Sequence, residues 1–255
     1  MAKRRLFLTF IVACLGVGPG IKVLSSQTTS IQAPPDTGKF IIQTVITKAR
    51  ENDKIKKEKL IYKRTYSVEN LNDKEQVTDQ EKKEVVIIEL GGQERMIEKN
   101  GKSVKPENQG KASKTKIDLI NVLEAVLKVD EFNVAKIDIM GDRPYYVINF
   151  KPKPNQNDKG GDVEDIIVRS EGVMYVDIEK FYIKKISAWM TRPYSRAGGL
   201  FNLSRANIEM AEEEFEGIIV MRSVTIIDKY WSILKGGTVF EKQTYEYKDY
   251  QLIQK

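Results

Sequence analysis

A long succession of segments with a two-residue hydrophobic period most strongly constrains the fold of this chain. In the first segment Leu60, Tyr62 and Tyr66 alternate with polar side chains, as expected for a half-buried β-strand. Turn sequences such as Asn100-Gly101 and Met140-Gly141-Asp142-Arg143 connect neighbouring segments directly. The further segments that we interpret as strands are residues 77–90, 94–98, 132–139, 144–151, 171–178, 181–192, 203–213, 217–228 and 237–251. Strands and helices do not alternate, so the pattern predicts an antiparallel sheet.

Three segments have helical periodicity instead. Residues 37–57 and 117–129 each carry an apolar stripe at helical spacing, and we interpret residues 162–168 as a short third helix. Residues 196–200, with Gly198-Gly199, are expected to form a loop. Because a sheet of this many strands curls to bury its apolar face, we predict a mainly β (α+β) fold. Its curved antiparallel sheet forms an incomplete β-barrel that two or three helices cover.

The beginning of the chain has the features of a bacterial secretion signal. A basic head is followed by an apolar stretch, residues 6–17, and then by small and turn-forming residues. The apolar stretch is too short to span a bilayer, which needs about 20 residues. We therefore predict a signal peptide over residues 1–25, followed by a flexible lead-in over 26–38 and a single domain over 39–255.

The only cysteine makes the processing of this signal ambiguous. Cleavage after Ser25 would leave a mature chain without cysteine, and hence without disulfides or thiolate chemistry. A competing interpretation is that Ile11-Val12-Ala13-Cys14 is a lipoprotein signal, so that Cys14 is lipidated and anchors the protein to a membrane. The sequence alone leaves both interpretations open.

The net charge of +6 does not indicate a nucleic-acid partner. Four of the basic residues, and no acidic ones, lie in residues 1–25, so removal of the signal leaves 6 − 4 = +2. A domain with this small excess has no electrostatic surface of the kind that binds nucleic acid. We expect no nucleic-acid partner and a monomer.

The residues that catalysis most often uses are missing. Histidine is absent, which removes the commonest general base and metal ligand. The paired glycines stand in no phosphate-binding motif. We interpret the acidic residues near the end of one strand as its solvated end; they are Glu209, Glu212, Glu213, Glu214 and Glu216. We therefore expect no catalytic residue, no metal and no cofactor, and a protein that is not an enzyme.

Apolar and aromatic residues on consecutive strands are candidates for a ligand cavity. An incomplete barrel can leave an apolar hollow beneath its helices, and methionine suits an adaptable lining. The residues that we predict to line such a cavity are Ile88, Tyr146, Ile148, Phe150, Met174, Val176, Ile186, Met190 and Val220. An ordinary filled core would produce the same pattern, so periodicity does not separate the two interpretations.

Several segments resemble the bacterial outer-membrane lipoprotein-sorting proteins of the LolA/LppX-like superfamily. These segments are Lys59–Arg64, Met96–Lys102, Tyr145–Pro154, Gly172–Glu179 and Tyr245–Tyr250, and the similarity extends over most of residues 40–251. The resemblance implies an incomplete antiparallel barrel with helices inside it or across its mouth, and carriage of lipid or lipidated protein without a cofactor. The insert at 153–161 and the acidic strand in the second half depart from the shorter carriers.

These observations lead to a functional hypothesis. We expect an exported, periplasmic protein that holds acyl chains of lipids or lipidated proteins in an apolar cavity of a half-barrel. The membrane surface and envelope proteins are further partners to be expected from that location. The alternative is an envelope scaffold or interaction protein that has the same fold and a filled core.

Overall fold

The computed structural model describes residues 36–90, 93–99, 101–105, 119–155 and 162–252. The expected signal peptide with Cys14, and all but the last residues of the expected lead-in, lie outside these ranges. The side chain of Ile88 lies outside the described part as well, although its backbone belongs to a strand.

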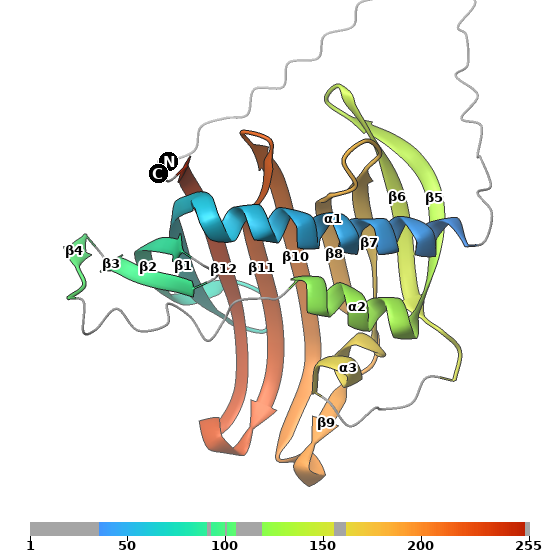
Figure 1. Cartoon of the computed structure of the whole chain (residues 1–255). Coiled ribbons are helices and arrows are strands. Elements are labelled where there is room, and N and C mark those ends of the chain that lie inside the picture. The colour runs from blue at the N-terminus through green and yellow to red at the C-terminus, as the bar shows by residue number, and fades with distance from the viewer. Residues whose placement is uncertain (1–35, 91–92, 100, 106–118, 156–161, 253–255) are drawn as a thin grey trace, which may run out of the picture. The chain divides into compact units, whose positions relative to one another are not determined.

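Twelve strands form one antiparallel sheet (Figure 1). Their bounds are β1 Leu60–Leu71, β2 Val77–Leu90, β3 Gln93–Lys99, β4 Lys102–Ser103, β5 Asp130–Met140, β6 Arg143–Pro152, β7 Ser170–Asp177, β8 Ile183–Met190, β9 Tyr194–Arg196, β10 Phe201–Phe215, β11 Ile218–Ser232 and β12 Gly237–Leu252. Their order is β4-β3-β2-β1-β12-β11-β10-β8-β7-β6-β5, and β9 pairs with β10 off this path. Within the described residues β4 and β5 are separate edges, so the sheet stays open. The predicted incomplete barrel is confirmed.

Short turns and one long-range pairing generate this order. The β5–β6 turn contains Gly141 at φ 66°, and the β10–β11 turn contains Gly217 at φ 78°, a backbone conformation that favours glycine. The long-range pairing joins the last strand to the first, since β12 pairs with β1 from Leu60 opposite Leu252 onwards. The C-terminal strand therefore lies inside the sheet and not at its edge (Figure 1).

One long helix crosses the sheet. Helix α1 (Thr37–Lys59) runs across the strands, with α2 (Leu119–Val129) and α3 (Asp162–Ile167) on the same face (Figure 1). Seven inter-strand spacings separate β1 from β5 in the sheet order, which at about 4.8 Å each give about 34 Å. A helix of 23 residues is also about 34 Å long. The length of α1 thus matches the width of this part of the sheet.

The main core lies between the helices and the sheet face that they cover. Ile42 and Val45 of α1, together with Leu123 of α2, belong to one buried cluster with residues of seven strands. At the start of α1 a glycine permits close approach to the edge strand, because a Cβ on Gly38 would lie 2.8 Å from the Cβ of Phe132. The helical period places apolar side chains on one face of each helix, and the two-residue period places them on one face of the sheet. These two apolar faces pack against each other in the core.

The sheet divides near one end of β11. Pairing between β11 and β12 extends from Ser223 to Ser232 on β11, whereas β11 begins at Ile218. Past this point, the described residues of β12 pair with β1 and no longer with β11. A second, small cluster of Leu60, Ile218 and Val220 lies at this division. Tyr250 packs against it and donates a hydrogen bond from its hydroxyl to the carbonyl oxygen of Met221.

The connections near residue 200 are more ordered than expected. Residues 194–196 form the short strand β9, and the predicted loop at 196–200 contains the 3₁₀-helix η2 (Ala197–Gly199). A second 3₁₀-helix, η3 (Ile233–Lys235), connects β11 with β12. Elements of three residues are too short to have a recognisable period, which is why the sequence did not predict them.

Candidate functional site

Most of the residues predicted to line a cavity lie together in the main core. This group consists of Ile148, Phe150, Met174, Val176 and Ile186, and Tyr146 packs against it. The same cluster contains side chains of α1 and α2. Ile148, Met174 and Val176 are 0% exposed. In this structure the predicted cavity wall is therefore covered by the helices.

The other predicted residues do not join that group. Val220 belongs to the small cluster with Leu60 and Ile218 at the division between β11 and β12. Met190 is partly exposed at the end of β8, opposite Ser170. The side chain of Ile88 is outside the described part of the chain.

An open cavity of about 260 Å³ lies beside the core, between the C-terminal half of α1 and the ends of β10 and β11. Its apolar lining comes from α1, α2, the β7–β8 turn and β11, with Val45, Ile55, Leu119, Ile120, Phe181, Ile219 and Met221. Exposed Lys48, Glu51 and Lys180 line it as well. Apolar walls with a few charged groups suit an amphiphilic ligand. None of the eight predicted residues with described side chains lines this cavity.

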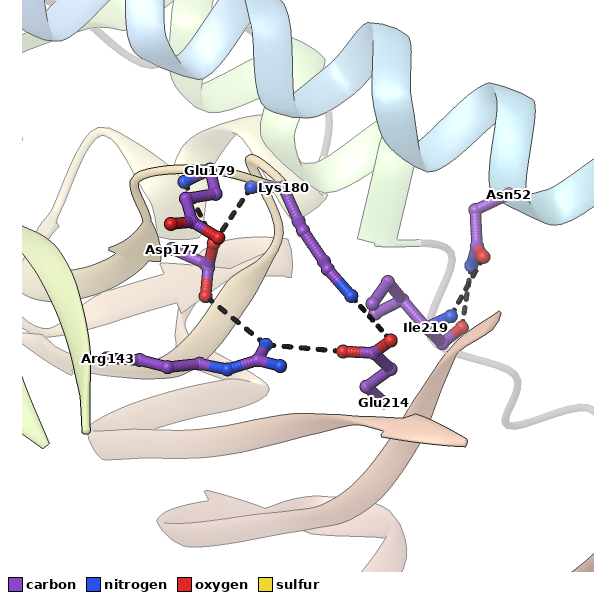
Figure 2. Close-up of polar contacts among 7 residues, drawn as sticks. All are labelled: Asn52, Arg143, Asp177, Glu179, Lys180, Glu214 and Ile219. Atoms are coloured by element: carbon purple, nitrogen blue, oxygen red, sulfur yellow. Dashed lines mark hydrogen bonds and ion pairs between the residues drawn. The ribbon is translucent and has the colours of Figure 1, made fainter. Parts of the chain in front are cut away.

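Helix α1 is tied to the sheet beside this cavity by one amide side chain (Figure 2). Asn52 Nδ2 donates to the carbonyl oxygen of Ile219 at 2.6 Å, and the Ile219 backbone N–H donates to Asn52 Oδ1 at 2.9 Å. Because β12 has already separated from β11 here, no described strand pairs with these Ile219 backbone groups on that side. Asn52 takes the place of a neighbouring strand.

At the same end of the sheet, a polar network joins the start of β6, the β7–β8 turn and the end of β10 (Figure 2). Asp177 Oδ1 accepts hydrogen bonds from the backbone N–H groups of Glu179 at 3.0 Å and Lys180 at 2.8 Å. The Arg143 guanidinium lies 3.8 Å from Asp177 and donates to Glu214 at 3.2 Å. Lys180 also donates to Glu214, and this bond, followed by that from Arg143, lowers the Glu214 pKa. The network fixes the β7–β8 turn that supplies Phe181 to the cavity.

One wall of the cavity contains a buried carboxyl group. Glu212 of β10 is 7% exposed and accepts a hydrogen bond at 3.3 Å from the backbone N–H of Ile183. Burial raises the pKa of Glu212 to about 7. The nearby Lys56 ammonium and the Ile183 hydrogen bond act in the opposite direction and are outweighed. Our interpretation of the acidic cluster as a solvated strand end is therefore wrong for Glu212.

A second open region lies at the other end of α1. It is a groove of about 900 Å³ whose lining includes Lys39, Asp130, Phe150 and Trp189. Asp130 is 2% exposed, and neither of its carboxylate oxygens has a hydrogen-bond partner among the described residues. Burial raises its pKa to about 7, while the charge of Lys153 lowers it. This groove is richer in polar groups and suits an acyl chain less well.

Two further properties concern metal sites and membrane spans. Among the described residues, no group of three or more cysteine, aspartate or glutamate side chains is placed to hold a metal ion. Of the helices in the described ranges, none combines the length and the apolar character needed to cross a bilayer.

The sequence predicted the strands and helices that line the cavity but not the cavity itself. Its walls come from segments that are more than 160 residues apart, from Val45 to Met221, and only the sheet order brings them together. The sequence could have predicted that Glu212 is buried, because side chains two residues apart lie on the same face of a strand and Glu212 is therefore on the same face of β10 as Ile208 and Met210. Both of those residues belong to the core or pack against it.

Comparisons with known proteins give distant structural similarity. No protein-family model and no curated protein sequence matches the chain. A crystal structure of a putative outer membrane lipoprotein-sorting protein domain from Vibrio parahaemolyticus is similar at 10% identity and a TM-score of 0.40, over 86% of this chain and 93% of that one. A LolA superfamily protein from Nitrosomonas europaea is similar at 11% identity and a TM-score of 0.35, over 84% and 94%.

A third similar structure is a DUF1329 family protein from Desulfovibrio piger, at 8% identity and a TM-score of 0.32, over 83% of this chain and 92% of that one. The first two structures bear the names of the group that the sequence segments resemble. At similarities of this size, the function has to be argued from the residues of this chain.

Proposed function

We propose that this chain is an exported, non-catalytic carrier that binds the acyl chains of lipids or of lipidated proteins in the periplasm. The observation that carries the proposal is the cavity beneath α1, with apolar walls and charged side chains beside them. Acyl chains are held by burial of apolar surface, at about 0.8 kcal/mol per methylene. Lys48 and Lys180 are paired with Glu51 and Glu214 in this structure, and both would stay in water and exchange these partners for an anionic headgroup.

The size of the cavity implies that binding of a long chain involves α1. A volume of about 260 Å³ is slightly below the range of about 300–1,000 Å³ that is typical of ligand pockets. A long acyl chain would therefore extend past Val45 into the layer between α1 and the sheet. Displacement of α1 would expose the core residues Ile148 and Met174 to the ligand, so that the predicted cavity residues would become its deeper part.

A specific observation also favours the alternative. Ile148, Met174 and Val176 are 0% exposed, so the layer under the helices is filled by the protein's own side chains. A protein with a permanently filled core would act as an envelope scaffold or interaction protein. The two functions differ in whether the purified protein takes up lipid.

Native mass spectrometry of the protein purified from a bacterial envelope, followed by titration with a fluorescent fatty acid, tests the proposal. We expect co-purified lipid and saturable uptake of the probe. Ala49→Phe would fill part of the cavity that Ala49 lines. Exclusion of two methylenes, at about 0.8 kcal/mol each, would weaken probe binding about tenfold.

The matched control is Gln43→Phe, which adds the same ring to an exposed position of the same helix. It should leave probe binding unchanged. A mass without bound lipid together with no uptake by the wild-type protein would support the scaffold function. Equal binding by both variants would show that this cavity is not the site.

A further inference from the structure

An exposed apolar surface lies at the opposite end of the sheet from the cavity. The exposed fractions are 93% for Leu234, 56% for Ile233, 50% for Leu200 and 39% for Trp231. These four residues, here called the apolar tip, belong to the β9–β10 and β11–β12 connections and the strand end beside them. Figure 1 places both connections at the lower end of the sheet, whereas α1 crosses its upper half.

The two connections are held together. The backbone N–H of Ile233 donates to the carbonyl oxygen of Leu200 at 3.2 Å. Directly beside this bond, β10 and β11 pair with Phe201 opposite Ser232. The apolar tip is therefore one surface built from two connected turns.

The two segments that build the apolar tip carry only positive charges, although the acidic residues Asp228 and Glu241 directly adjoin the second segment. Residues 192–205 and 229–240 contain five lysines and arginines and no acidic residue. Two of the cations, Arg205 and Lys229, form ion pairs with Glu75 and Asp73 of the β1–β2 turn. Arg192, Arg196 and Lys235 are exposed, and the Arg192 guanidinium donates a hydrogen bond to the carbonyl oxygen of Val168 at 2.9 Å. Lys235 directly follows Leu234, the most exposed apolar side chain.

We propose that the apolar tip docks the protein onto a bilayer surface that contains anionic lipid. Leucine and isoleucine side chains would enter the boundary between headgroups and acyl chains, and Trp231 would lie at headgroup level, where its ring is favoured. Arg196 and Lys235 would face the lipid phosphates, which attract basic residues near an anionic surface. This inference does not depend on the proposed acyl cargo.

A second copy of the chain is a less suitable occupant. Contact between two apolar tips would bring the exposed cations of both copies together, and like charges oppose such contact. An anionic bilayer offers apolar and negatively charged partners at once, which matches both properties of the surface.

Flotation with lipid vesicles tests the docking surface. All proteins carry Cys14→Ser and are checked by mass spectrometry for the same N-terminus, so that differences arise from the substituted residue alone. The wild-type residues should bind vesicles of phosphatidylethanolamine and phosphatidylglycerol, and binding should weaken between about 0.1 M and about 1 M salt. Leu234→Asp should lower partitioning about tenfold or more. Lys235→Ala should lower it about fivefold, and only when phosphatidylglycerol is present.

The matched control is Ile139→Asp, because Ile139 is 70% exposed in the β5–β6 hairpin at the other end of the sheet. It should bind vesicles as the parent protein does. A variant with Trp189→Phe leaves Trp231 as the only tryptophan, and its fluorescence should shift to shorter wavelength when vesicles are added. Unchanged flotation of Leu234→Asp, or an equal loss with Ile139→Asp, would overturn the proposal.

Self-association would also overturn it. If sedimentation velocity finds a dimer that Leu234→Asp dissociates, and vesicles are not bound, the surface is a contact between copies. Ala49→Phe separates this inference from the proposed function, because it should weaken fatty-acid binding about tenfold and leave vesicle binding intact. Vesicle binding without uptake of fatty acid would therefore support the docking surface and reject the cargo.

Discussion

The buried carboxyl group of Glu212 makes the stability of the protein depend on pH in a defined direction. Its pKa is raised from 4.5 to about 7 in the folded chain, mainly by burial. Between these values the folded state keeps a proton that the unfolded state has released, so stability falls as pH rises. The stabilising effect of protonation is complete below pH 4.5 and is lost above about pH 7. Within this interval each pH unit lowers the free energy of unfolding by about 1.4 kcal/mol, and the interval from pH 4.5 to about pH 7 lowers it by about 3 kcal/mol.

The substitution Glu212→Gln removes this dependence with little change in shape. The amide oxygen can still accept the hydrogen bond that Ile183 donates at 3.3 Å. Because the amide is neutral, its burial does not require a charged group to lose its hydration. Urea unfolding at pH 5 and pH 8.5 measures the effect. We expect the stability advantage of Glu212→Gln over the wild-type protein to grow by about 2–3 kcal/mol between the two pH values.

The control for this prediction is Glu214→Gln, two positions along the same strand. The Lys180 ammonium, followed by Arg143, lowers the pKa of Glu214. The charged form of Glu214 is therefore the favoured one, and its loss should reduce stability at pH 8.5. The reasoning is refuted if the advantage of Glu212→Gln is equal at both pH values, or if the two substitutions change stability with the same sign at pH 8.5.

Two further substitutions test the attachment of α1 and the packing of the sheet. Asn52→Ala removes the bonds of 2.6 and 2.9 Å to Ile219 and should lower the free energy of unfolding by about 1–3 kcal/mol, measured by urea titration; unchanged stability would mean that water replaces the amide without cost. Gly172→Ala would place a Cβ 2.3 Å from the backbone oxygen of Ser187, which should cost about 1–3 kcal/mol or more in thermal unfolding. Its control Gly237→Ala meets nothing within 4 Å and should be nearly neutral, so equal losses in both variants would contradict the packing argument.

The parts of the fold that follow from local periodicity were predictable. Helix α1 was expected at 37–57 and is found at Thr37–Lys59, and the hairpin around Met140-Gly141-Asp142-Arg143 joins β5 and β6 as expected. Both signals lie within one short stretch of chain, where side-chain spacing alone determines which face is buried.

The site depends on contacts that local patterns do not contain. Pairing of β12 with β1 and the division between β11 and β12 leave the Ile219 backbone free for Asn52, 167 residues earlier in the chain. The choice between a filled core and a lipid cavity was open for the same reason. An apolar side chain such as Ile148 gives the same sequence pattern whether a helix or a ligand covers it.

Because the length of α1 matches the width of the sheet between β1 and β5, a change in the number of strands there requires a change in the length of the helix. Removal of one strand between β1 and β5 would narrow the sheet by about 4.8 Å, which equals about three helical residues. A variant that lost a strand without shortening α1 would carry one surplus helical turn past Phe132 at the edge. Lengthening α1 alone would rotate its apolar stripe relative to Leu60, where the helix enters β1. Helix length and strand number should therefore change together in any protein that keeps this arrangement.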